Sequence, residues 1–315
     1  MTASLDLAAI RSHFPSLASG TAHFDGPGGT QTPDVVARAV HDTLVAPLSN
    51  RGVLTEAERN ADVAVTEARA ALGDLLAADP SGIVFGRSMT QLTMELARTL
   101  AKRWGPGDEV VVSRLDHDAN VRPWVQAAEA RGATIRWIDL DPATGEIDLP
   151  SVDAAIGPRT RLVAITGASN LIGTIPPVRA IADRAHAVGA LVYVDGVHST
   201  AHRFADLDAL GGDFYVCSGY KFLGPHCAVL GASPALLETI VPDKLLPSTN
   251  VVPERFELGT LPYELLAGVT AAVDVLASLA PAATGDRRAR LRAAFHLLDA
   301  HELRLRRRIE EGLAA

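Results

Sequence analysis

Three lysines occur in this chain, and one of them stands where an amine could do covalent chemistry. Lys102 lies near the end of an expected helix and Lys244 in a proline-flanked loop, whereas Lys221 lies in the apolar, strand-like run DFYVCSGYKFLGPHCAVLG. Burying an ammonium group is unfavourable, so the pKa of a buried lysine falls and its amine becomes a better nucleophile. The alternative is a lysine at a strand end that buries only its aliphatic stem and keeps its charge in water.

A carboxylate and two histidines follow another apolar run, in LVYVDGVHSTAH (191–202). Asp195 emerges at the end of this run, where a carboxylate needs a cation or hydrogen-bond donors. It could be a metal ligand, a turn residue that begins a helix, or the partner of a protonated ring nitrogen. His198 and His202 are four residues apart, a spacing that a helix places on one face and that can bind zinc. The glutamate of an H-E-x-x-H motif is absent. Two interpretations stay open: a metal hydrolase built on Asp195, His198 and His202, or two ordinary surface or packed histidines.

A possible anion site lies in FGRSMTQLTMELA (85–97), where an apolar run ends and a helix is expected to begin near Thr90. The free N–H groups and the positive end of a helix attract anions, and Ser88 or Thr90 could add a hydroxyl. An ordinary helix N-cap explains the same serine and threonine.

Three further segments contain polar or glycine residues beside apolar runs. RLDHDANVRPW (114–124) contains His117, which could be a base, a ligand, an aromatic stacker or a hydrogen-bonded loop histidine. TGASNLIGT (166–174) carries Asn170 in a segment that could equally be a simple turn. The glycines of FDGPGGTQTP (24–33) permit close backbone approach but match neither a dinucleotide fingerprint nor a P-loop.

Short apolar runs alternate with alanine-rich helical stretches along the chain. Uniformly apolar strands separated by helices indicate an α/β protein, with a parallel or mixed sheet covered on both faces. Function in such sheets collects at the carboxyl ends of the strands, where the residues above are expected. The expected strands are 82–85, 109–113, 134–140, 161–167, 190–196, 213–219 and 227–232, and the expected helices are 55–78, 90–104, 121–131, 178–188, 233–240 and about 264–313.

Composition restricts the possible partners and compartments. A net charge of −8 argues against a nucleic-acid partner or an anionic membrane surface. No apolar run approaches the ~20 residues of a membrane helix, and the N-terminus has no signal-peptide pattern. Two cysteines, Cys217 and Cys227, fit a reducing compartment, so a cytoplasmic location is expected.

The segments together resemble a known family. The anion-site turn, the His117 loop, Asn170, Asp195 and the S-G-Y-K segment have the order and spacing of the class V aminotransferases, the branch of the pyridoxal-phosphate enzymes that includes the cysteine desulfurases. The resemblance runs from about Phe24 to Thr260 and into the C-terminal helices. The segments FDGPGGTQ, LDHDAN, ASNLIGT, VDGVH and YKFLGPH are similar to those of the cysteine desulfurase-like subgroup. The implied fold is the large domain of fold type I of these enzymes, a mostly parallel sheet covered by helices on both faces.

The resemblance implies a role for each matching residue, with Lys221, His117 and Asp195 as the catalytic residues. Lys221 would carry the aldehyde of pyridoxal 5′-phosphate (PLP) as a Schiff base, the internal aldimine. Asp195 would pair with the protonated pyridine nitrogen, and His117 would stack on the ring. The other implied cofactor contacts are Met89, Thr90, Ser218 and Tyr220 at the phosphate, Asn170 near the ring hydroxyl or the substrate carboxylate, His198 beside the ring hydroxyl, and Thr260 at the phosphate of a partner subunit, so a homodimer is implied.

Three positions depart from the usual desulfurase pattern. His198 stands where desulfurases usually carry glutamine, and Tyr220 stands where they usually carry histidine. The turn carries Met89 and Thr90 where a pair of threonines is common, which removes one side-chain donor. A histidine and a phenol can still bind at their positions, and the backbone donors of the turn remain.

The resemblance also implies a division of the chain. Residues 1–20 would form an N-terminal arm, 21–265 the PLP-binding large domain, and 266–315 a helical segment leading into a truncated small domain. In the family the small domain supplies an arginine for the substrate carboxylate and, in true desulfurases, the nucleophilic cysteine. Neither Cys217 nor Cys227 matches that cysteine, and Cys217 is expected in the core.

The expected function is that of a PLP-dependent enzyme acting on a small amino acid, most closely a carbon–sulfur lyase of the cysteine desulfurase-like kind. Transamination or epimerisation on the same scaffold is an alternative. A non-catalytic PLP-binding protein is a further alternative, because the small domain is expected to be absent.

Overall fold

The protein is described by a computed structural model of residues 5–314. A seven-stranded sheet runs in the order β1-β7-β6-β5-β4-β2-β3. Neighbouring strands from β6 to β3 pair in parallel, while β7 is antiparallel to both β1 and β6. The strands are β1 (Ile83–Gly86), β2 (Glu109–Ser113), β3 (Thr134–Ile138), β4 (Thr160–Thr166), β5 (Leu191–Asp195), β6 (Phe214–Ser218) and β7 (Ala228–Ala232). The expected α/β fold, a mostly parallel sheet between helices, is confirmed.

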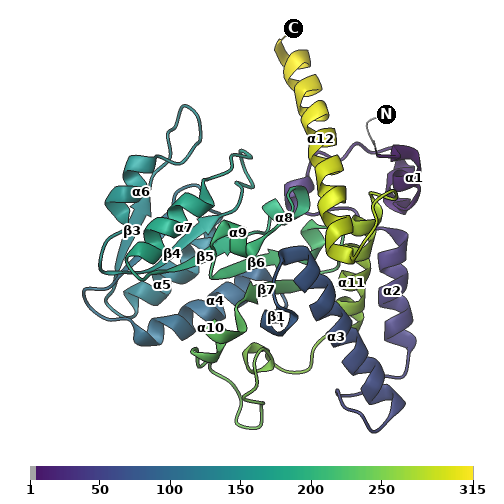
Figure 1. Cartoon of the computed structure of the whole chain (residues 1–315), viewed down its shortest axis with the longest axis horizontal. Coiled ribbons are helices and arrows are strands. Elements are labelled where there is room, and N and C mark those ends of the chain that lie inside the picture. Colours follow the sequence, from purple (N-terminus) through teal and green to yellow (C-terminus); the bar gives the residue numbers. More distant parts are fainter. Residues whose placement is uncertain (1–4, 315) are drawn as a thin grey trace.

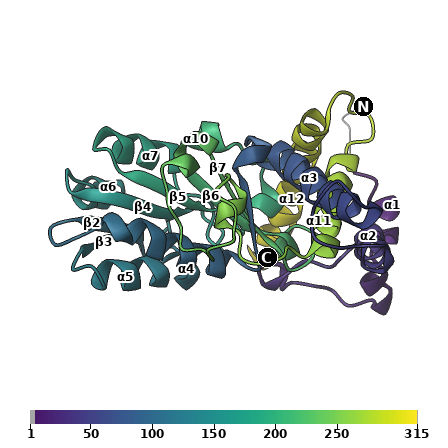
Figure 2. The ribbon, with the colours of Figure 1, turned by 90° about the horizontal axis from the view of Figure 1, so that it is seen from below.

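Helices cover both faces of the sheet (Figures 1 and 2). They are α1 (Leu7–Ser12), α2 (Asp34–Val45), α3 (Glu56–Leu76), α4 (Met89–Leu100), α5 (Arg122–Glu129), α6 (Leu149–Ala155), α7 (Val178–Ala187), α8 (Ser199–His202), α9 (Leu207–Leu210), α10 (Pro234–Glu238), α11 (Tyr263–Ser278) and α12 (Arg287–Ala314). The helix expected over 90–104 ends earlier, at Leu100, and the sequence did not predict α2 and α6. Among residues 5–314, no helix is both long and apolar enough to cross a membrane.

Alternating residues of the inner strands enter different cores, because successive strand side chains point to opposite faces. Val110 and Val112 of β2 pack in a core with Trp124 of α5 and with residues of α4. Val111, between them, belongs to the other core, which contains Leu72 of α3 and residues of α7 and α11. Burial on both faces explains why these strands have continuous apolar sequences.

The C-terminal region consists of two helices and not of one continuous helical stretch. The chain leaves the helical conformation between α11 and α12, in a segment that contains Pro281 and Gly285. Proline and glycine both disfavour a helix interior, so this break has a local cause. The helix α11 packs on α2 and α3, and the boundary proposed at residue 265 falls inside α11. The division of the chain into domains stays a prediction.

The buried residues of the helix α12 lie in its first turns. They are Leu291, Ala294 and Phe295, and its C-terminal part projects away from the body (Figure 1). The ring of Phe295 lies 6.1 Å from that of Phe204, measured between centroids. Further along, Glu302 pairs with His202, so contacts as far as Glu302 set the direction of the helix.

Replacing Phe295 by alanine is expected to lower the free energy of unfolding by about 3–5 kcal/mol, because the substitution leaves a cavity under α12. Denaturant unfolding measures the change. The matched control is Leu313→Ala on the same helix, whose side chain is 83% exposed and whose loss should leave the midpoint unchanged. Equal effects of the two substitutions would contradict the packing described here.

Candidate active site

The loops that follow β1, β2, β4, β5 and β6 meet at one cavity of about 120 Å³. The directions of these strands place their carboxyl ends at the same edge of the sheet. The cavity is lined by nine of the residues predicted from the sequence, namely Met89, Thr90, His117, Asn170, Asp195, His198, Ser218, Tyr220 and Lys221. Thr260 does not line this cavity and lies on the exposed surface.

Asp195 is the last residue of β5 and is only 5% exposed. Its Oδ1 accepts a hydrogen bond from the Val197 N–H at 2.9 Å, and among residues 5–314 no donor reaches Oδ2. Burial raises the pKa of Asp195 to about 6, against the Val197 hydrogen bond and the positive fields of His117 and Lys221. A buried carboxylate with a free oxygen is suited to hold a cationic or protonated group in the cavity.

The turn after Asp195 requires glycine. A Cβ atom on Gly196 would lie 2.0 Å from a ring carbon of Tyr215, so no side chain fits there. The chain can therefore turn directly from β5 into α8 and keep Asp195 at the floor of the cavity.

Lys221 ends the turn Gly219–Lys221 and is half-buried. Its ammonium donates a hydrogen bond to the carbonyl oxygen of Pro27, and its Nζ lies 4.9 Å from the centre of the Tyr220 ring. Burial lowers the pKa of Lys221, and the negative charge of Asp195 opposes this shift. The direction of the shift agrees with the expectation from the sequence, and Lys221 lines the cavity.

The start of α4 presents hydrogen-bond donors to the cavity. Ser88 is the N-cap, and its Oγ accepts from the Gln91 N–H at 3.1 Å. The Met89 N–H points to the Oγ of Ser218 at 3.4 Å, and the exposed Thr90 follows. The first N–H groups of a helix have no carbonyl partner within it, so this end is suited to bind an anion. Ser88 is thus an ordinary cap, while Thr90 and Ser218 line the cavity.

His117 lies on the loop after β2 and is fixed by its own backbone. Its Nδ1 accepts a hydrogen bond from the Ala119 N–H at 3.0 Å, which assigns the ring proton to Nε2 in the neutral form. The ring is exposed and lines the cavity.

Asp116 is a half-buried acid beside the site that sequence reasoning did not assign. Its carboxylate accepts hydrogen bonds from the Ser113 hydroxyl and from Asn120 Nδ2, the latter at 2.6 Å. Burial raises its pKa to about 7, the nearby charge of Asp195 adds to the shift, and the two hydrogen bonds oppose it. The sequence offered one signal for this acid. Ser113 and Asn120, two polar residues on either side of Asp116, follow an apolar run and could donate hydrogen bonds to it.

Asn170 stands in the turn that follows β4. The Ser169 N–H donates to the Thr174 carbonyl at 2.9 Å, and the Ser169 Oγ accepts from the Ile172 N–H at 3.4 Å. The segment is therefore a turn, and it also directs Asn170 to the cavity lining.

His198 is the N-cap of α8 and His202 its last residue, and their ring centroids lie 4.8 Å apart. His202 Nδ1 lies 2.9 Å from Oε1 of Glu302 on α12, and this carboxylate raises the pKa of His202. Burial lowers the pKa of His198, and the charges of His202 and Lys221 add to that shift. No group of three or more His, Cys, Asp or Glu side chains within residues 5–314 is arranged to hold a metal ion, so Asp195 and the two histidines form no such set.

A second cavity of about 400 Å³ adjoins the first. It shares Pro27, Ala168, His198 and Lys221 with the first cavity and extends to Glu302 of α12. The site is therefore continuous from the start of α4 to the C-terminal helix.

The glycine-rich loop near residue 26 supports the Lys221 turn. Thr30 donates from its N–H to the Tyr220 carbonyl at 2.9 Å, and its Oγ1 accepts from the Leu223 N–H at 2.9 Å. Leu223 has φ of +73°, a left-handed conformation that is unfavourable for a branched side chain. Sequence analysis noted the close approach that the glycines of this loop allow but missed Pro27 and Thr30 as contacts of the turn.

Both cysteines are buried and unreactive. Cys217 is 0% exposed and Cys227 is 1% exposed. Burial raises the pKa of each thiol to about 12. Neither is available as a thiolate near neutral pH, and the expectation of a core position for Cys217 is confirmed.

Comparisons with known proteins place this geometry in a wider context. Residues 22–305 match the family described as aminotransferase class V. An uncharacterized protein of Mycobacterium tuberculosis is 36% identical over 94% of this chain and 74% of its own length, and a cysteine desulfurase of Dickeya dadantii is 34% identical over 86% and 70%. The crystal structure of the cysteine desulfurase CsdA from Escherichia coli superposes with a TM-score of 0.77 at 28% identity, covering 90% of this chain and 73% of CsdA.

Replacing Asp116 by asparagine is expected to stabilise the cofactor-free protein at high pH only. The folded state holds the Asp116 proton to about pH 7, while an unfolded aspartate releases it near pH 3.9, so this group's contribution to stability falls as pH rises between these values. The gain of Asp116→Asn over the wild type should therefore grow between about pH 4 and 7 and then stay constant. It is limited to about 1.4 kcal/mol per unit of pKa shift and reduced by partial exposure.

Denaturant unfolding at several pH values measures this difference. Asp118→Asn, which removes an exposed carboxylate two residues away, is the matched control and should show no such growth. A gain for Asp116→Asn that is equal at pH 5 and pH 8 would contradict the assignment.

Proposed function

The chain belongs to the class V aminotransferase family, and we propose that it uses PLP to cleave the carbon–sulfur bond of a small amino acid such as cysteine. PLP is the cofactor of this chain, as its family membership and its desulfurase relatives establish. The observation that carries the proposal is the meeting of one lysine amine and one buried carboxylate, Lys221 and Asp195, in the same cavity.

The donors around the cavity fit this cofactor. Asp195 has a free carboxylate oxygen for a protonated ring nitrogen, and Lys221 has an amine with a lowered pKa for the aldehyde. The first N–H groups of α4 and the hydroxyl of Ser218 form a place for a phosphate. We assign the remaining contacts as the family resemblance implies, with Met89, Thr90 and Tyr220 at the phosphate, His117 on the ring face, Asn170 at the ring hydroxyl or the substrate carboxylate, and His198 at the ring hydroxyl.

We also propose that the protein acts as a homodimer. Thr260 is exposed and lies outside the cavity of its own chain, which supports a contact with the phosphate in the cavity of a second copy. A closed dimer makes the same contact twice, once for each site.

When bound, PLP supplies an aldehyde carbon and an electron-withdrawing ring that stabilises negative charge at the substrate Cα. Lys221 is the only lysine that lines the cavity, and its lowered pKa leaves more free amine to react with an aldehyde and to accept the proton from Cα. Asp195 forms no ion pair with another residue in the described range 5–314, so its carboxylate would be free to hold a proton on the ring nitrogen. His198, whose pKa is lowered, stays neutral and can donate a hydrogen bond to an oxygen of the bound substrate.

Neither Cys217 nor Cys227 can supply the thiolate that a persulfide-forming reaction needs beside the leaving sulfur. The reaction that we propose for the residues described is elimination, in which cysteine and water give pyruvate, ammonia and hydrogen sulfide. Product analysis separates it from transamination, which yields an oxo acid without sulfide, and from epimerisation, which yields only the mirror-image amino acid.

Borohydride reduction of the PLP-loaded protein is expected to attach the cofactor to Lys221 alone, because it is the only amine in the cavity. Peptide mass mapping identifies the modified residue. Lys221→Ala should lose both the adduct and the visible absorbance of bound cofactor, while Lys244→Ala, a change at an amine outside the cavity, should retain them. An adduct on Lys102 or Lys244 in the wild type would refute the assignment.

Asp195→Asn is expected to bind PLP yet lower kcat for sulfide release on the order of 100-fold, because the ring nitrogen no longer keeps its proton. Sulfide and pyruvate assays with cysteine measure the loss, and the absorbance of the bound cofactor verifies loading. Asp183→Asn, an exposed carboxylate paired with Arg179, is the control and should retain full turnover. Unchanged turnover in Asp195→Asn would overturn this role.

A further inference from the structure

We propose that Arg69 and Glu257 are positioning residues for cofactor binding, because their buried ion pair fixes the segment 254–260 so that Thr260 can reach the phosphate in a second copy of the chain. The inference rests on the homodimer of the proposed function. It adds two residues that do not line the cavity.

The ion pair joins distant parts of the chain inside the protein. Arg69, on α3, donates from Nη1 to Glu257 Oε1 at 3.0 Å and from Nη2 to Oε2 at 2.9 Å, a two-pronged contact. Both residues are 7% exposed. The Arg69 guanidinium also lies 4.9 Å from the centre of the Phe85 ring.

The same two side chains bind the backbone of β1. Arg69 Nη1 donates to the Ile83 carbonyl oxygen, and Glu257 Oε1 accepts from the Phe85 N–H at 2.9 Å. The pair therefore locks Glu257 to the strand that leads directly into Ser88 and the start of α4. The position of the segment 254–260 is thus fixed relative to α4, whose start forms the anion site.

A second arm extends the network toward the surface. Glu254 accepts from Arg51 Nη1 at 3.0 Å and lies 3.6 Å from Arg69 Nη2, and Arg51 in turn donates to Asp62 of α3 at 2.9 Å. The segment is held at both Glu254 and Glu257, so the residues that follow Glu257 start from a fixed point.

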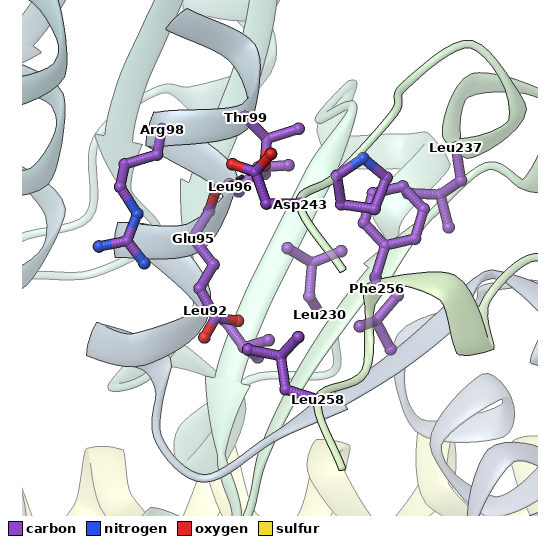
Figure 3. Close-up of a pocket in the computed structure, with 12 residues that line it drawn as sticks. Leu92, Glu95, Leu96, Arg98, Thr99, Leu230, Leu237, Asp243, Phe256 and Leu258 are labelled. Carbon is purple, nitrogen blue, oxygen red and sulfur yellow. Dashed lines mark hydrogen bonds between the residues drawn. The ribbon is translucent and has the colours of Figure 1, made fainter. Parts of the chain in front are cut away.

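The other side of the segment faces α4. Phe256 and the exposed Leu258 line a cavity of about 110 Å³ together with Leu92 and Leu96 of α4 (Figure 3). Phe256 also packs against the core that contains these two leucines, so the segment lies between β1, through Glu257, and α4, through Phe256. Thr260 comes two residues after Leu258, past Gly259, whose φ of +73° sets the direction of the chain.

The energetics of a buried ion pair indicate that this pair serves to position the segment and not to stabilise the fold. Removing two charges from water is costly, and a buried ion pair is often no more stable than apolar residues of similar volume. Burial raises the pKa of Glu257 despite its contact with Arg69, so the cost of burial outweighs the effect of the arginine on this carboxyl. The value of such a pair lies in the single geometry that it imposes, here at a segment with an exposed threonine at its end.

The experiment compares the binding of PLP with that of pyridoxal, which lacks the phosphate. In the double variant Arg69→Met/Glu257→Leu, PLP is expected to bind at least about tenfold more weakly, the effect of losing a hydrogen bond to a charged group, while pyridoxal binds as in the wild type. Thr260→Ala should reproduce this selective loss. Adding Thr260→Ala to the double variant should cause no further loss, because one contact cannot be lost twice.

The matched control is Arg287→Met, which removes a partly buried arginine that bridges Asp74 of α3 and Asp274 of α11 and should leave both affinities unchanged. If the double variant does not fold, Glu257→Gln serves in its place, since it keeps the shape of the side chain and weakens the contact. Equal weakening of PLP and pyridoxal, or full additivity with Thr260→Ala, would overturn the inference. A wild type that binds neither molecule would instead refute the proposed function.

Discussion

The site depends on a carboxylate that the fold forces out of water. Asp195 ends a strand buried on both faces, and Gly196 lets the chain turn without uncovering it. A charge in that position is tolerated only if positive groups or donors meet it, and His117 and Lys221 are the groups whose fields do so. The loops after the other strands bring His117 and Lys221 to the same edge of the sheet, where their positive fields act on this acid.

Much of this was accessible from the sequence because the signals are local. The strands that lead into the site are short apolar runs, and polar residues at their ends or within a few residues after them mark the carboxyl ends. Parallel order brings those ends to one edge, which is why His117, Asn170, Asp195 and Lys221 could be grouped without coordinates. The low number of lysines made Lys221 conspicuous, and its lowered pKa follows from the apolar run that surrounds it.

The remainder could not be predicted because it depends on contacts between distant parts of the chain. Arg69 and Glu257 are 188 residues apart, and nothing in either local sequence marks them as partners. The support of Leu223 by Thr30 spans 193 residues in the same way. Asp116 was overlooked for a different reason: its surroundings, and not its neighbours in sequence, raise its pKa. The break between α11 and α12 did have local markers, Pro281 and Gly285, that the overall helical composition concealed.

The position of α12 has an electrostatic consequence. The helix has 28 residues and is thus about 42 Å long, and its buried residues end at Phe295. Glu302 lies seven residues, or about 10 Å, further along the helix, where its carboxylate pairs with His202. The C-terminal helix therefore sets the charge on His202, whose field acts on His198 in the cavity lining.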